Sequence, residues 1–124
     1  MTFLEFGRLS YINRERCSRW HPGFPSEEDP AVAWSGGDWA NAMQGEAGEA
    51  GNVVKKLRRL ETAKRGRPTE EDAAELVAKL GAELADTIIY ADLLATYYGV
   101  DLPAAIIAKF NATSVEYGFP ERLS

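Results

Sequence analysis

The sequence predicts an all-α protein of about four helices, and three observations support this fold class. Apolar residues recur at three- and four-residue steps through long segments of the chain. Aspartate, glycine and proline, which suit the ends of helices, stand at the borders of these segments. Strand signals are absent, since nothing alternates between polar and apolar residues for long. The 124 residues fit one domain over 1–124.

The N-terminal half is expected to contain a helix, a loop and a second helix. The first helix is predicted over residues 2–20, and residues 21–37, with three prolines and three glycines, are predicted to form a loop. The second helix is expected to start from a cap at Asp38 and to end near Lys64. Its expected buried stripe consists of Met43, Ala47, Ala50, Val54 and Leu57.

Two further helices are predicted in the C-terminal half. The run from Thr69 to Asp72 has the pattern of a capping box, and the third helix is expected to end near Tyr98, before Gly99. Its expected apolar stripe consists of Leu76, Leu80, Leu84, Ile88, Ala91 and Ala95. Asp101 is expected to cap a fourth helix that reaches about Tyr117.

Composition excludes some classes of function. The formal net charge is −5, so the chain lacks the excess of Lys and Arg that a nucleic-acid polymer requires. The single cysteine forms no internal disulfide and fits a reducing compartment. No apolar run approaches the roughly 20 residues that span a bilayer, and the N-terminal residues lack a signal-peptide layout. We expect a cytoplasmic protein with no membrane partner.

Two acidic pairs are the main indication of a functional site in the sequence. Glu46 and Glu49 are three residues apart on one predicted helix, and Glu83 and Asp86 repeat this spacing on the next. Apolar residues flank both pairs, so the carboxylates would converge if these faces meet. Converging carboxylates repel one another, and a hard cation such as Mg²⁺ relieves the repulsion through oxygen ligands. The plain alternative, that each pair lies on a solvated helix face, stays open at this point.

Two other interpretations of the acidic residues have less support in the sequence. Asp92 also lies in an apolar helix and would be a fifth ligand, but its isolation favours a structural hydrogen bond or ion pair. A di-iron bundle needs Glu-x-x-His pairs, and the only histidine, His21, lies in the predicted loop.

The segments "GEAGEAGNVVKKLRR", "ELADTIIYADLLA" and "DLPAAIIAKFN" resemble the MazG-like all-α nucleoside triphosphate pyrophosphohydrolases. The resemblance covers about residues 14–122, and the Glu-x-x-Glu and Glu-x-x-Asp signatures match position by position. It implies a helical bundle completed by dimerisation, sometimes as a tetramer. It also implies Mg²⁺-dependent cleavage of a (d)NTP between the α- and β-phosphates, giving (d)NMP and pyrophosphate. Mn²⁺ is the alternative cofactor.

The resemblance assigns expected roles to individual residues. The metal ligands are Glu46, Glu49, Glu83 and Asp86, and one glutamate of the first pair, Glu49 in preference to Glu46, would orient the attacking water as base. Lys109 matches a phosphate-contacting lysine, while Lys55 and Lys56 are further phosphate candidates. Asn111 stands two residues after Lys109, whereas relatives often carry Lys-x-x-x-Asn. Trp20 and His21 are preferred over Trp34 for contact with the base.

Two other functions remain open from the sequence. One is a phosphoribosyl-ATP pyrophosphohydrolase, which belongs to the same superfamily. The other is a non-catalytic helical dimer that binds nucleotide or metal.

Overall fold

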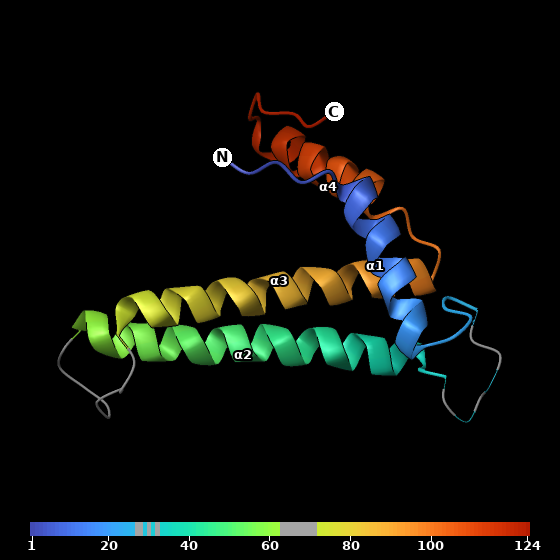
Figure 1. Cartoon of the computed structure of the whole chain (residues 1–124). Helices are drawn as coiled ribbons and strands as arrows, with labels where there is room; N and C mark the ends of the chain where they lie inside the picture. Colours follow the sequence, from blue (N-terminus) through green and yellow to red (C-terminus); the bar gives the residue numbers. More distant parts are fainter. Residues whose placement is uncertain (27–28, 30, 32, 63–71) are drawn as a thin grey trace. The chain divides into compact units, whose positions relative to one another are not determined.

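The computed structural model describes residues 1–26, 29, 31, 33–62 and 72–124, and these ranges contain helices and no strand. The helices are α1 (Phe6–Trp20), α2 (Gly36–Thr62), α3 (Ala73–Tyr97) and α4 (Leu102–Tyr117) (Figure 1). The prediction of an all-α protein with about four helices is therefore confirmed. The chain divides into two compact units, which we call the hairpin unit (37–91) and the terminal unit (1–36 and 92–124).

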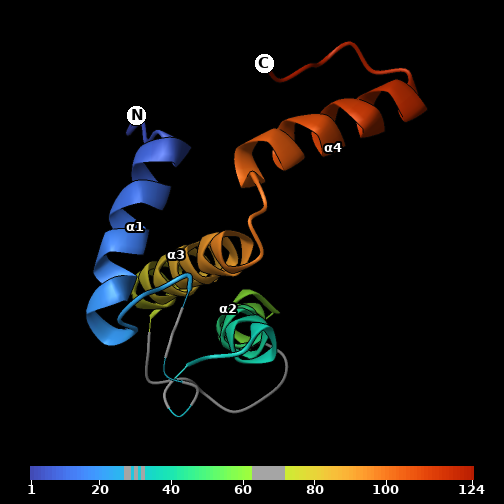
Figure 2. The ribbon, with the colours of Figure 1, turned by 90° about the vertical axis from the view of Figure 1, so that its right-hand side faces the viewer.

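The hairpin unit consists of α2 and most of α3, which run antiparallel and side by side (Figures 1 and 2). Its core is small. Trp39, Ala50, Val53 and Leu76 are buried, and the rings of Trp39 and Tyr90 lie 6.4 Å apart between centroids. Burial of these side chains supplies the apolar contact that keeps the two helices paired.

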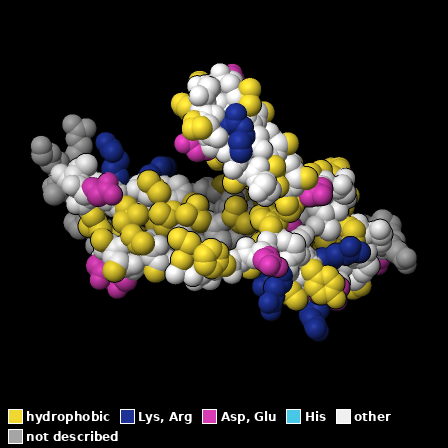
Figure 3. Space-filling model, turned by 90° about the horizontal axis from the view of Figure 1, so that it is seen from above, with side chains coloured by type: hydrophobic (Ala, Val, Ile, Leu, Met, Phe, Trp, Pro, Cys, Tyr) yellow, Lys and Arg dark blue, Asp and Glu magenta, His cyan; other side chains and the backbone are white. Residues whose placement is uncertain are grey.

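The expected buried stripes of α2 and α3 are partly wrong. Val54, Leu84 and Ile88 were expected in the core, but 48, 51 and 49% of their surfaces are exposed. Val53 is buried instead, and Glu83 is half-buried. Each helix carries two apolar patterns one residue apart. The inward pattern includes the large ring of Trp39 on α2, and Glu46 and Glu83 lie half-buried beside it. Figure 3 shows hydrophobic side chains left exposed along this helical pair.

A buried aspartate ties two helices of the terminal unit together. Asp92, in the last turns of α3, is 2% exposed and accepts hydrogen bonds from the Ser10 hydroxyl (2.7 Å) and the Asn13 side-chain amide (2.8 Å), both on α1. This confirms the prediction that Asp92 holds a structural hydrogen bond. Cys17, also on α1, is buried, and burial raises the pKa of its thiol to about 11 against the opposing charge of Arg16. The thiol is therefore neutral and unreactive at neutral pH.

The predicted ends in the C-terminal half are close to those observed. After α3, Gly99 adopts a left-handed conformation with φ of 69°, and the Val100 amide donates to the Ala95 carbonyl. These are features of a Schellman motif. Asp101 caps α4 by accepting from the Ala104 amide at 3.1 Å. Asp72 caps α3 through the Glu75 amide at 2.8 Å, while Lys64 and the run Thr69–Glu71 lie outside the described residues.

Two predicted starts are wrong. The first helix begins at Phe6 rather than at residue 2, because Glu5 is extended and the preceding Phe3 is 87% exposed, so no burial supports an earlier turn. The second begins at Gly36, so Asp38 lies in its first turn and is not the cap. Gly36 is buried against the Tyr98 ring, where a Cβ atom would overlap the hydroxyl. That close approach explains why this position requires glycine.

No single helix in the described ranges is long and apolar enough to cross a membrane. Only α3 and α4 taken together, as one bent pair, meet that test of length and composition.

Candidate metal centre

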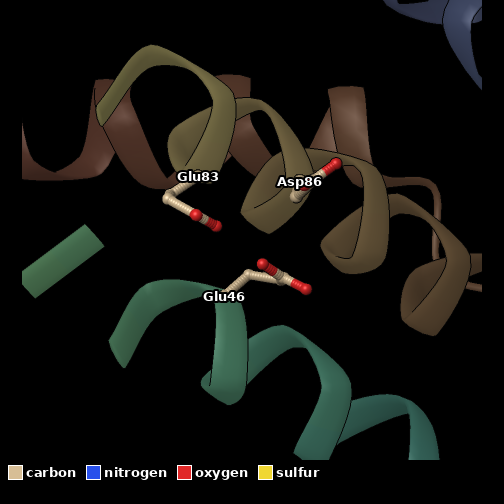
Figure 4. Close-up of side chains that lie close together, drawn as sticks. All are labelled: Glu46, Glu83 and Asp86. Atoms are coloured by element: carbon tan, nitrogen blue, oxygen red, sulfur yellow. The ribbon is translucent and has the colours of Figure 1, made fainter. Parts of the chain in front are cut away.

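Three carboxylates come together within the hairpin unit. Glu46 projects from α2 toward Glu83 and Asp86 on α3 (Figure 4). One oxygen from each residue lies within 4.8 Å of the other two. We call these three residues the acidic triad. Its two α3 members share a helix face because they are three residues apart.

The triad forms because the acidic positions belong to the packed faces of both helices. On α2, Glu46 lies one helical turn before the buried Ala50 and two turns before the buried Val53. On α3, Glu83 lies seven residues after Leu76, which is completely buried. Packing of these apolar neighbours therefore places the carboxylates of the two helices opposite one another.

The triad is open to solvent on one side. Glu46 and Glu83 are half-buried, whereas Asp86 is exposed. A cation or a ligand can therefore reach the carboxylate oxygens without a movement of the helices. Hard cations such as Mg²⁺ bind this way, through one or two carboxylates and retained waters or phosphate oxygens.

The proximity of the carboxylates perturbs their ionisation. The pKa of Glu46 is raised above its ordinary value, first by a hydrogen bond with Glu83, then by partial burial, and then by the negative charges of Asp86, Glu83 and Glu49. A shared proton of this kind relieves repulsion between carboxylates in the absence of a cation. A bound divalent ion would replace that proton.

This raised pKa predicts how the stability of the metal-free protein depends on pH. Between the ordinary and the raised pKa of Glu46, the folded protein holds a proton that the unfolded chain has lost. The free energy of unfolding should therefore fall as pH rises through that interval, and the stabilisation is fully present only below the ordinary value. Urea unfolding with EDTA at a series of pH values measures this slope.

A matched pair of variants tests the assignment. Glu46→Gln should flatten the pH slope, whereas Glu15→Gln, at an exposed position on α1, should leave it unchanged. Equal slopes in the wild type and Glu46→Gln would contradict the assignment.

Glu49, the fourth predicted ligand, stands apart from the triad. Its side chain is exposed, and it is not one of the three residues whose oxygens lie within 4.8 Å of each other. Its negative charge still contributes to the raised pKa of Glu46, so it is electrostatically coupled to the site. The geometry therefore brings together Glu46, Glu83 and Asp86 and leaves Glu49 beside them.

The predicted phosphate-binding residues fall in different units. Lys55 is exposed and Lys56 half-buried on α2, in the hairpin unit. Lys109 is exposed on α4, in the terminal unit. Asn111 is engaged elsewhere: its side-chain amide donates to the Leu123 carbonyl at 2.9 Å and its oxygen accepts from the Leu123 amide at 2.8 Å. Asn111 thus holds the C-terminal tail against α4.

The aromatic residues predicted to contact a base have separate environments within the terminal unit. Trp20 is 70% exposed, and the Arg16 guanidinium lies 5.9 Å from the centroid of its ring. His21 packs edge-to-face with Trp34, with centroids 4.9 Å apart. The family resemblance favours Trp20 and His21 over Trp34 for contact with a base. The geometry adds Trp34 to the candidates as the ring that contacts His21.

Comparison with protein-family models, with curated proteins and with solved structures found no match to this chain. Interpretation of the acidic triad therefore depends on its own geometry and on the sequence motifs.

Proposed function

We propose that this chain is a Mg²⁺-dependent nucleoside triphosphate pyrophosphohydrolase of the MazG-like kind, active in the cytoplasm. The reaction would cleave a (d)NTP between the α- and β-phosphates and release (d)NMP and pyrophosphate. The observation that carries the proposal is the convergence of Glu46, Glu83 and Asp86 from two helices on one point. The pKa of Glu46 is raised by a hydrogen bond with Glu83, then by burial and by the neighbouring negative charges, and a bound cation would offset the repulsion among these carboxylates.

The chemistry of the triad suits a triphosphate substrate. All three side chains offer oxygen ligands, which Mg²⁺ and Mn²⁺ prefer, and the site is open on one side for phosphate oxygens. Bound Mg²⁺ would neutralise phosphate charge, orient the triphosphate and lower the pKa of a water molecule.

The remaining residues have distinct proposed roles. Glu49 lies beside the triad and is exposed, so its carboxylate is available to accept a proton from the attacking water. Lys55, Lys56 and Lys109 are cations suited to phosphate oxygens, while His21, Trp34 and Trp20 offer aromatic faces for a base. Asn111 would have to release Leu123 before it could contact a substrate.

A homodimer or tetramer is part of this proposal. Val77, Leu84 and Ile88 lie on one face of α3, at steps of seven and four residues, and each exposes about half of its surface or more. An apolar row of this kind is typical of a surface that a partner covers. A second copy of the chain is the partner that the family resemblance implies.

We expect Leu84→Lys to weaken the dimer. An unpaired ammonium in an apolar contact should raise the dissociation constant of the dimer by about tenfold or more. Sedimentation over a range of concentrations measures this constant. Ala78→Lys, at an exposed position on another face of α3, is the matched control and should leave the constant unchanged. A wild-type chain that is fully active as a monomer would contradict the proposed assembly.

The function itself is tested by pyrophosphate release from a panel of dNTPs and NTPs, with Mg²⁺ and with EDTA. The expected result is metal-dependent release with a preference among the bases. Phosphoribosyl-ATP belongs in the same panel, and its exclusive turnover would assign the other enzyme of the superfamily. Folded, metal-bound protein that releases pyrophosphate from none of them would favour the non-catalytic binding protein.

A further inference from the structure

A groove in the terminal unit is separate from the residues of the proposed hydrolase site. Its volume is about 570 Å³, within the range of small-molecule sites. One wall comes from α1, where Gly7, Tyr11 and Arg14 follow one another at helical spacing. Pro25 lines it from the loop after α1, and Thr96 together with residues 99–101 lines it from the end of α3 and the following turn. All of these residues belong to one compact unit.

The groove carries a cation and an anion on different elements. Arg14 is exposed, and its guanidinium forms no ion pair or hydrogen bond with the residues that the structure describes. Asp101 is also exposed, and one carboxylate oxygen accepts from the Ala104 amide while the other remains for a ligand. The groove is therefore lined by opposite charges that come from α1 and from the turn after α3.

The lining of the groove offers both hydrogen-bond acceptors and hydrogen-bond donors to a ligand. The Ser10 hydroxyl donates its proton to Asp92, and the Thr96 hydroxyl donates its proton to the Asp92 carbonyl at 2.9 Å. Both oxygens can therefore only accept from a ligand. With Asp101 they offer acceptors suited to an ammonium group. Arg14 and the Tyr11 hydroxyl offer donors suited to a carboxylate.

The rest of the lining consists of apolar surface and of glycines, which have no side chain. Pro25, Val100 and the Tyr11 ring supply apolar surface. Gly7 and Gly99 add no side chain, and a Cβ atom built on either residue would meet nothing within 4 Å. Space is thus left beside the charged groups for a side chain of moderate size.

We propose that this groove binds a free α-amino acid with an apolar or aromatic side chain. Its carboxylate lies against Arg14 and Tyr11, its ammonium group against Asp101 and the Ser10 and Thr96 oxygens, and its side chain against Pro25 and Val100. This inference is independent of the proposed hydrolase activity, because no residue of the acidic triad takes part.

Calorimetric titration of the full chain with three probes tests the proposal. L-phenylalanine carries both charges, 3-phenylpropionate only the carboxylate, and phenethylamine only the ammonium group. L-phenylalanine should bind about tenfold or more tightly than either of the others, because each of them leaves one charged group of the groove unsatisfied. Absence of saturable binding by L-phenylalanine, or equal affinity for all three, would overturn the proposal.

Two variants separate the charges. Arg14→Gln should weaken L-phenylalanine and 3-phenylpropionate but not phenethylamine. Asp101→Ser, which keeps a residue able to cap α4, should weaken L-phenylalanine and phenethylamine but not 3-phenylpropionate. Arg19→Gln, an exposed arginine of α1 outside the groove, is the control. Identical titrations for all three variants would also overturn the assignment.

A third variant guards against loss of fold. Gly7→Leu places a good helix former in α1, and its side chain enters the groove without meeting an existing atom at the Cβ position. It should keep the helical circular dichroism spectrum and abolish binding of L-phenylalanine. Undiminished binding by folded Gly7→Leu would show that the groove is not the site.

Discussion

Exchanging Glu49 for glutamine is expected to lower Mg²⁺-dependent pyrophosphate release by about 10²–10⁴-fold, the range that a positioned general base contributes. Glutamine keeps the shape of the side chain but accepts no proton. Because Glu49 is exposed on α2 and lies outside the acidic triad, its exchange should leave the helical fold and most of the cation affinity in place. Initial rates of pyrophosphate release, with circular dichroism as a check on folding, measure the effect.

Two other variants serve as controls for the Glu49→Gln measurement. Glu83→Gln removes a member of the triad, so it should weaken Mg²⁺ binding in calorimetry, whereas Glu49→Gln should weaken it less. Glu15→Gln, far from the acidic pairs in sequence, should behave as the wild type. Full turnover by Glu49→Gln would reject its role as base, and equal loss of Mg²⁺ binding in both variants would make Glu49 a ligand instead.

Replacement of Asp92 by alanine is expected to lower the free energy of unfolding by about 3 kcal/mol or more, since a hydrogen bond to a charged group contributes about 1.5–3 kcal/mol. Asp92 accepts two such bonds, at 2.7 and 2.8 Å, and Asn13 is only 3% exposed. The alanine variant would remove the carboxylate that accepts from the buried Asn13 amide. Against a typical stability of about 5–15 kcal/mol, this is a large loss. Urea unfolding gives the change.

Asp92→Asn and a double variant refine the test. The new amide oxygen can still accept from Asn13, and the Ser10 hydroxyl can turn to accept from the new amide group, so Asp92→Asn should cost clearly less than alanine. In an Asp92→Ala background, a further Asn13→Ala exchange should cost less than Asn13→Ala alone, because the hydrogen bond between the two side chains is already lost. An Asp92→Ala protein with wild-type stability would show that these hydrogen bonds do not hold α1 to α3.

Some features of the fold could be predicted because their causes are local. Gly99 and Asp101 mark the end of α3 and the start of α4 through the backbone conformation of one residue and the side-chain acceptor of the other. The start of α2 could not be predicted in this way. At that start the Tyr98 ring lies against Gly36, and this contact joins residues far apart in the sequence.

The candidate site could be predicted only in part, because only some of its features have local causes. The three-residue spacing within each acidic pair is local, and it correctly indicated that Glu83 and Asp86 share a face of α3. The rotation of each helix about its axis is not local, since it depends on which of two overlapping apolar patterns packs against the other helix. This rotation sets Glu49 beside the triad and leaves Leu84 exposed, and neither could be read from spacing alone.

The two overlapping apolar patterns of the hairpin unit give the proposed cation a structural consequence. Adjacent residues in a helix differ by about 100° in direction, so turning each helix by one residue would bury Val54 and Leu84 and carry the carboxylates outward. That rotation would also turn the buried Trp39 ring outward, so the observed pairing keeps this apolar contact. A divalent ion bound by Glu46, Glu83 and Asp86 would stabilise the observed pairing and not the rotated one. The proposed cation would therefore also hold each helix at the rotation that leaves Val54 and Leu84 exposed.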